Sequence, residues 1–205
     1  GRWIAESSAG DTGRAYTWIA ETTGRSFDQL EEAARLVEPG AEGTVAVLGP
    51  PRMDMSSVGL RAGGLLFPVP VTMNERGPGH LARAGLESVA FSIKANLAQL
   101  TQVTGTAPAS IALGGGMARS GLFRDVVANV LDADILVLGH RSASALGAFV
   151  SAMTTVAQFD SLAQGSGWAE GALIRVAPSP LFASEYEDHY GRWLEASSGL
   201  AKLQL

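Results

Sequence analysis

The residues of this chain best suited to chemistry are three consecutive glycines, Gly114–Gly116, which follow the apolar run SIAL and precede a helical pattern. Glycine has no Cβ atom, so the backbone at such a run can approach a flat or charged ligand closely. The helix that follows would present free N–H groups and the positive end of its dipole. The run therefore indicates either a nucleotide-binding turn or a tight connection between a strand and a helix.

Two familiar phosphate-binding motifs do not fit this run. A P-loop needs Lys-Ser/Thr after its second glycine, whereas Gly116 and Gly121 are followed by Leu122 and Phe123. A dinucleotide fingerprint needs a third glycine where the chain has Arg119, and no acidic residue closes the next predicted strand. A dinucleotide-binding domain stays open as an alternative, without its usual motif.

Composition limits the classes of protein that this chain can represent. Its 205 residues, 46% of them hydrophobic, suffice for one large or two small domains with a buried core. The 15 lysines and arginines are scattered and the net charge is -5, which argues against nucleic-acid binding. No apolar run approaches the roughly 18 to 20 residues that span a membrane. Cysteine is absent, and His140 and His189 lack metal-spaced partners, so we expect no metal site.

The elements that must position the glycines alternate between strands and helices. Periodicity predicts strands over 44–49, 110–113, 133–138 and 172–178, and helices over 13–20, 27–38, 80–104, 119–131, 142–159 and 179–198. A loop-rich stretch, 50–79, separates the first predicted strand from the third predicted helix. This alternation argues for an α/β fold with a substantially parallel sheet.

Several side chains have expected environments that the structure can test. Ser26 and Gln29 form a predicted capping box at the start of the second helix. Glu87 and Asp125 are expected on solvated helix faces. Trp18 and Trp193 are expected in the core.

Four segments, in order along the chain, resemble motifs of the FGGY carbohydrate kinases, the family of glycerol kinase, xylulokinase, gluconokinase and ribulokinase. The glycine run lies in the longest of them, which continues into ADILVL and SASALGAF. The segments are TGRAYTWIAE at 12–21, HLARAGLESVAFSIKANLAQL at 80–100, IALGGGMARSGLFRDVVANVL and its continuation at 111–152, and YEDHYGRWLEA at 186–196. Gly85 and the long 50–79 stretch depart from the family pattern and suggest a divergent subgroup.

The resemblance implies an actin/hexokinase-like (ribonuclease H-like) α/β fold, with a mixed, mostly parallel sheet flanked by helices. Residues 1–205 would form the single C-terminal, nucleotide-binding domain of a two-domain kinase. The family's catalytic aspartate and most sugar contacts belong to an N-terminal domain that would precede Gly1. The chain begins without methionine, so we expect it to be part of a longer protein. It should contain no catalytic residue and be inactive alone.

The resemblance also implies which residues bind ATP. Gly114 and Gly115 would lie against the adenosine, Ser120 would supply a polar contact, and residues of the first helix would meet the nucleotide from the other side. The small residues 145–148 would pack their helix closely on the core. Magnesium would arrive with the nucleotide and would not be held by side chains of this chain. The full set of nucleotide-binding residues is Gly13, Thr17, Gly114, Gly115, Gly116 and Ser120.

The expected function is therefore transfer of the γ-phosphoryl group of ATP to a hydroxyl of a sugar or polyol, in the cytoplasm. The sugar or polyol would be a partner through the missing domain, and a second copy of the chain would be a partner in a homodimer. Neither nucleic acid nor a membrane is expected. The second alternative is a non-catalytic oligomerisation module that uses the 80–104 helix and the SALGAF helix. The sugar cannot be read from these residues.

Overall fold

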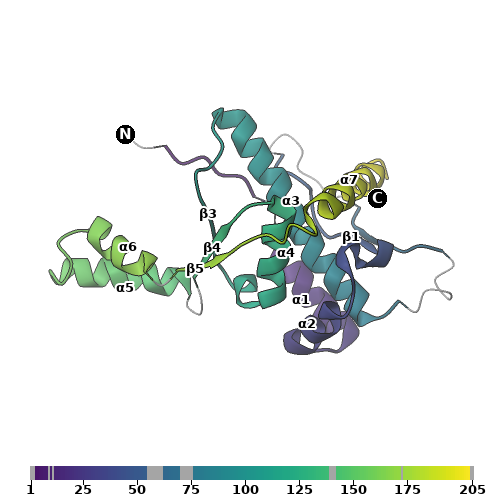
Figure 1. Ribbon diagram of the computed structural model, residues 1–205, viewed down its shortest axis with the longest axis horizontal. Coiled ribbons are helices and arrows are strands. Elements are labelled where there is room, and N and C mark those ends of the chain that lie inside the picture. Colours follow the sequence, from purple (N-terminus) through teal and green to yellow (C-terminus); the bar gives the residue numbers. More distant parts are fainter. Residues whose placement is uncertain are drawn as a thin grey trace.

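The fold is organised around one long helix, α3 (Pro78–Thr104), which runs through the middle of the molecule (Figure 1). The computed structural model describes residues 3–8, 10, 12–54, 62–69, 76–138, 142–171 and 173–203. Much of the predicted 50–79 loop lies outside these ranges. The elements that pack most extensively on α3 are α1 (Thr12–Thr23), α2 (Phe27–Arg35), the 3-10 segment η1 (Pro39–Gly43), strand β1 (Val45–Val47), α4 (Gly121–Leu131) and α7 (Ala183–Leu200).

This packing buries α3 on all sides between Ala82 and Ser92. A polar face towards water was expected on this helix, and that expectation is wrong for its first half. Arg83 is 6% exposed and Glu87 is 3% exposed. A helix that is surrounded by other elements has no solvated face, so these two charges must be paired inside the protein. Asp125, by contrast, lies exposed on α4 as expected.

The sheet that carries the glycine run has three strands in the order β3 (Ile111–Leu113), β4 (Ile135–Leu138), β5 (Leu173–Val176). Strands β3 and β4 are parallel, and β5 is antiparallel to β4. A separate antiparallel pair joins β1 to β2 (Gly64–Leu66), a strand within the predicted loop. The α/β class and the mixed sheet are confirmed, whereas the expectation of a mostly parallel sheet is wrong for the described strands.

A hairpin of two helices explains the direction of β5. Between β4 and β5 the chain forms α5 (Ala143–Thr155) and α6 (Leu162–Glu170), which pack against each other. A single helix would return the chain to the start of the preceding strand and make the next strand parallel. Two antiparallel helices return it to the end that it left, so β5 runs the other way. The sequence indicated one helix here, and α6 was missed.

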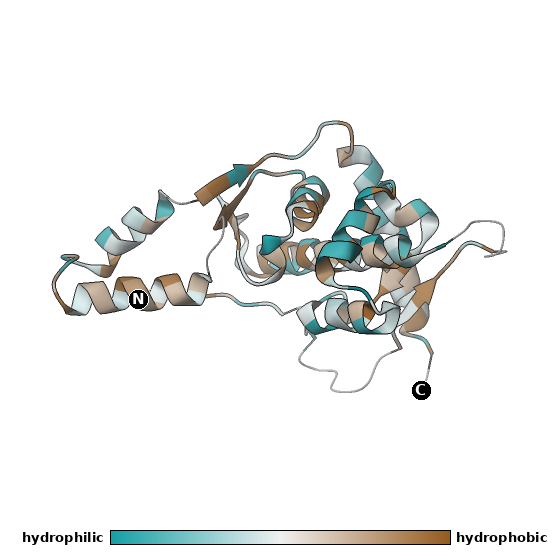
Figure 2. Cartoon of the chain, turned by 90° about the horizontal axis from the view of Figure 1, so that it is seen from below, coloured by the Kyte–Doolittle hydropathy of each residue, from teal (hydrophilic) through white to brown (hydrophobic). Residues whose placement is uncertain are grey.

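The α5–α6 hairpin projects from one end of the sheet, and its apolar stretches are visible in Figure 2. Residues 145, 147 and 148 of α5 are exposed, and Leu146 is half-buried. Close packing of residues 145–148 on the core was expected, and the structure contradicts it. The hairpin is held instead by its own aromatic cluster: the Trp168 ring lies 5.6 Å from that of Phe149 and 5.9 Å from that of Phe159.

Two local features of the sequence gain a physical reason. The capping box at the start of α2 is confirmed, because Ser26 Oγ accepts from Gln29 N at 3.3 Å and Gln29 Oε1 accepts from Ser26 N at 3.0 Å. Gly85 lies where α1 crosses α3, and a Cβ atom there would be 2.5 Å from Ile19 Cδ1. The departure from the family pattern at Gly85 therefore permits a close helix crossing.

The two tryptophans differ in their environments. Trp193 is 1% exposed, and its indole Nε1 donates to Ala46 O at 3.0 Å, so the core prediction is confirmed for it. Trp18 is 48% exposed, so the same prediction is wrong there. Within the described part of the chain, no helix combines the length and apolarity needed to cross a membrane.

Candidate functional site

A pocket of about 790 Å³ opens between α1, α2, α3 and the turn from β3 to α4. This volume lies within the roughly 300–1,000 Å³ that is usual for small-molecule sites. Its lining includes all six residues predicted to bind nucleotide: Gly13, Thr17, Gly114, Gly115, Gly116 and Ser120. The fold thus brings together residues separated by about a hundred positions in sequence, although their contact with a nucleotide stays a prediction.

The glycine turn forms one wall of the pocket. Gly115 has φ of +100°, a left-handed conformation that favours glycine. Gly116 has ordinary helical angles, φ -61° and ψ -42°, and an added Cβ atom would meet no described atom within 4 Å. A Cβ atom on Gly114 would lie at an ordinary distance, 3.7 Å, from Ala143 Cβ. Backbone conformation therefore explains glycine at position 115 alone, whereas neither the backbone nor a neighbouring protein atom requires glycine at 114 or 116.

The start of α4 differs from what the sequence indicated. Ser120 is the N-cap, and its Oγ accepts from Phe123 N at 3.0 Å. The neighbouring Leu122 N donates to Glu31 Oε1 at 3.1 Å. The N–H groups of Leu122 and Phe123 were expected to be free for a ligand, and both are already used by the protein. A phosphate group would therefore have to displace a carboxylate to bind at this helix end.

Helix α2 places Glu31 at this position, and the sequence offered no signal for it beyond a helical Glu–Arg pair. The Glu31 carboxylate also accepts from Arg35 Nη2 at 2.6 Å. Partial burial acts to raise the pKa of Glu31, but hydrogen bonds from Leu122, Ser120 and Arg35 outweigh burial and hold the pKa below its usual value. Glu31 is therefore ionised at neutral pH.

Aromatic and apolar side chains complete the pocket. The rings of Tyr16 and Phe27 stack with centroids 5.9 Å apart, and Phe27 remains 51% exposed. Burial, with a smaller contribution from the Glu31 charge, raises the pKa of Tyr16 to about 12. Thr17 Oγ1 donates to Gly13 O at 3.0 Å on the α1 side. The lining residues that sequence reasoning did not assign to a site are Tyr16, Phe27, Asp28, Glu31, Leu86, Val89, Ile93, Leu113, Met117, Arg119 and Phe123.

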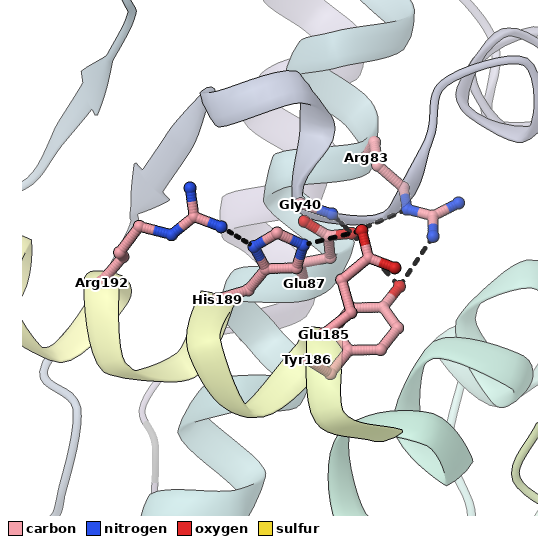
Figure 3. Close-up of polar contacts among 7 residues, drawn as sticks. All are labelled: Gly40, Arg83, Glu87, Glu185, Tyr186, His189 and Arg192. Carbon is pink, nitrogen blue, oxygen red and sulfur yellow. Dashed lines mark hydrogen bonds and ion pairs between the residues drawn. The ribbon is translucent and has the colours of Figure 1, made fainter. Parts of the chain in front are cut away.

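A second polar cluster, around Glu87, is drawn in Figure 3 and does not belong to the pocket lining. Glu87 Oε1 accepts from Arg83 Nε at 2.8 Å, from Gly40 N at 2.9 Å and from the Tyr186 hydroxyl at 3.2 Å. Arg83 Nη2 donates to that hydroxyl at 2.7 Å. Burial raises the pKa of Glu87, and the adjacent Arg83 guanidinium opposes the rise. The cluster joins α3 to η1 and α7, so we assign it a structural role.

Among the described residues, no group of three or more His, Asp or Glu side chains is arranged to hold a metal ion. His140 lies outside the described residues. His189 lies 3.4 Å from Glu185 Oε1 and contacts Arg192 (Figure 3).

Comparison with known protein families identifies the chain. The family model described as "FGGY family of carbohydrate kinases, C-terminal domain" matches residues 1–156. The chain belongs to the FGGY family of carbohydrate kinases. The resemblance carried by the sequence motifs is thereby confirmed. The match ends at Val156, directly after α5, so α6, β5 and α7 lie beyond it.

Curated FGGY relatives carry the names of sugar kinases. A putative sugar kinase of Bacillus subtilis, YoaC, is 30% identical over 153 residues, which is 73% of this chain and 31% of that protein. The L-fuculokinase of Escherichia coli K12 is 29% identical over 160 residues, which is 78% of this chain and 31% of that enzyme. The chain therefore spans about a third of the length of these relatives.

Solved FGGY kinase structures share the fold. The xylulose kinase of Rhodospirillum rubrum matches with a TM-score of 0.68 and 25% identity, over 92% of this chain and 38% of that one. The glycerol kinase of Plasmodium falciparum, solved with ADP, matches with a TM-score of 0.72 and 18% identity, over 97% of this chain and 38% of that one. The actin/hexokinase-like fold expected from the resemblance is confirmed.

Proposed function

We propose that this chain is the ATP-binding half of a carbohydrate kinase, which transfers the γ-phosphoryl group of ATP to a hydroxyl of a sugar or polyol. The observation that carries the proposal is that all six predicted nucleotide residues line one pocket. Family membership supports the kinase assignment. Glycine at 114 and 116, which no protein contact requires, supports the assignment of that wall to a ligand.

Each part of the pocket has a role in this proposal. The backbone of Gly114–Gly116 would pack against the adenosine, because no Cβ atom holds the ligand away. The apolar side chains of α3, Leu86, Val89 and Ile93, would exclude water from beneath the base. Thr17 and Ser120 would supply polar contacts from opposite sides. Bound ATP supplies the phosphoryl group, together with the magnesium ion that it carries.

Catalysis needs a group that this chain would not supply. A sugar hydroxyl must lose its proton as it attacks phosphorus, and a carboxylate is the usual acceptor. Glu31 is already engaged by three donors, Leu122, Ser120 and Arg35, so it is a poor base. We assign proton removal to the family's N-terminal domain. The chain alone should therefore bind nucleotide without phosphorylating sugar.

Calorimetric titration tests the proposal against its alternatives. We expect ADP and magnesium-ATP to bind one site per chain with dissociation constants of roughly 1 μM to 1 mM, as is usual for metabolic substrates. NAD⁺ should not bind. Binding of NAD⁺ without ADP would favour a dinucleotide-binding domain. Self-association of the chain without binding of any nucleotide would favour the oligomerisation module.

A further inference from the structure

The Glu31 carboxylate, paired with Arg35, occupies the start of α4, where a helix N-terminus would otherwise attract an anion. We infer that Glu31 orients the bound nucleotide, by accepting hydrogen bonds from its nucleoside end and by keeping its phosphates away from α4. This inference rests on the proposed function, because it concerns a nucleotide in that pocket. It assigns to Glu31 a role in specificity rather than in the chemical step.

Glu31 already engages the groups at the start of α4 that would attract a phosphate, namely Leu122 N and the Arg35 guanidinium. Glu31 is ionised, since donors from Leu122, Ser120 and Arg35 lower its pKa. It takes the N–H of Leu122, which is one of the α4 groups that could otherwise hold a phosphate oxygen. Asp28, one helical turn earlier on α2, lines the same pocket and adds a second acidic side chain. Arg119 also lines the pocket, so acidic and basic side chains are both present. A phosphate is disfavoured here because it would have to displace Glu31 from Leu122 N and from Arg35.

The same wall suits a group that donates hydrogen bonds. A carboxylate offers about four acceptor positions, and three protein donors use three of them. The Glu31 side chain keeps 24% of its surface exposed and lines the pocket. The nucleoside carries donors, namely the ribose hydroxyls and the amino group of adenine, whereas ionised phosphates only accept. The remaining acceptor position therefore fits the nucleoside end.

The aromatic pair beside Glu31 supports the same orientation. Phe27 lies four residues before Glu31 on α2, so both side chains share one face of that helix. The Phe27 ring is braced by the stacked Tyr16 ring and is 51% exposed in the pocket lining. An exposed aromatic ring can stack on a base, with a contribution of about 1–3 kcal/mol in nucleic-acid complexes. The adenine base would then stack on Phe27 on the same wall of the pocket that carries the Glu31 carboxylate.

The substitution Glu31→Gln tests the inference, because it should change the affinities for adenosine and for ADP in the same direction. Glutamine retains an acceptor for Leu122 N, so the cap of α4 should persist. The unfolding temperature of the protein should therefore stay unchanged. We expect the affinities for adenosine and for ADP to fall together, by about five- to tenfold, because a charged acceptor becomes neutral. Calorimetry on the purified protein measures both affinities. Glu32→Gln is the matched control, since Glu32 is exposed on the same helix and does not line the pocket.

Three other results of the Glu31→Gln titrations would overturn either the inference or the proposed function. Tighter binding of ADP with unchanged binding of adenosine would place the phosphates at α4 and overturn the inference. Unchanged affinity for both ligands would also overturn it. Absence of ADP binding by the unsubstituted protein would overturn the proposed function itself.

Nucleotide analogues identify the donor that Glu31 accepts from. 2′,3′-Dideoxy-ADP lacks the ribose hydroxyls, and inosine diphosphate lacks the amino group of the base. The analogue that lacks the interacting donor should bind the unsubstituted protein and the Glu31→Gln variant equally, as in a double-mutant cycle. A purely structural role for Glu31 would leave the same five- to tenfold difference with both analogues, and that result would overturn a direct contact.

Discussion

Substitution of Arg83 by methionine is expected to lower the free energy of unfolding by about 3–5 kcal/mol, because it leaves a buried carboxylate without its partner. Glu87 is 3% exposed, and its Oε1 accepts from Arg83 Nε at 2.8 Å. Methionine fills similar space but donates no hydrogen bond. The Tyr186 hydroxyl and Gly40 N cannot replace a positive charge. Urea unfolding followed by circular dichroism measures the change.

Two matched variants separate the buried charge from other effects. Arg175→Met removes the partner of Asp134 in an exposed ion pair and should leave the free energy of unfolding nearly unchanged. The double variant Arg83→Met/Glu87→Met removes both charges and should recover most of the lost stability. A loss in the double variant as large as that in Arg83→Met would show that lost packing, and not the unpaired carboxylate, is responsible.

The pH dependence of Arg83→Met gives a second readout. Burial already raises the pKa of Glu87 above its ordinary value, and loss of the guanidinium should raise it further. A carboxyl group whose pKa is raised on folding stabilises the fold while protonated and loses that contribution as pH rises through the folded-state pKa. The variant should therefore lose stability, relative to the unsubstituted protein, as pH rises from about 5 to 8. A constant difference over that interval would contradict this explanation.

Substitution of Gly116 by valine is expected to weaken ADP binding by roughly 10- to 100-fold, which corresponds to the ~1–3 kcal/mol cost of overfilling a packed site. Gly116 lines the pocket, and its φ of -61° and ψ of -42° are accessible to any residue. A Cβ atom there would contact no described protein atom within 4 Å, so the fold should not change. Calorimetry measures the affinity, and thermal unfolding checks the fold.

The choice of Gly116 follows from the backbone. Gly115 has φ of +100°, so valine at that position would strain the turn and mix two effects. Gly191→Val is the matched control, because Gly191 is exposed on α7 and an added Cβ atom also has no described atom within 4 Å. ADP affinity that is unchanged in Gly116→Val would show that the nucleotide does not occupy this wall.

Local patterns predicted the parts of the fold that depend on neighbours in sequence. The capping box at Ser26 and the helix after His80 follow from side-chain spacing alone. The six nucleotide residues came from motifs whose order matched a known family, and the structure places them around one pocket. Their role remains a prediction, whereas their convergence is a fact of the fold.

The features that sequence did not predict depend on contacts between distant elements. Local sequence predicts Glu87 on a solvated helix face, but η1 and α7 cover it in the folded protein. Glu31 caps a helix that lies 91 positions away from it in the chain. The direction of β5 depends on the α5–α6 hairpin, and α6 has no strong helical signal. Periodicity cannot encode such pairings, because each involves two segments with independent patterns.

A crystal structure of this protein with ADP is the most direct test of the nucleotide site. We expect the adenosine to lie against Gly114–Gly116, with Ser120 and Thr17 in contact range and the phosphates directed away from the first turn of α4. ADP bound elsewhere on the surface would contradict the site. ADP whose phosphates displace Glu31 from the start of α4 would contradict the orientation.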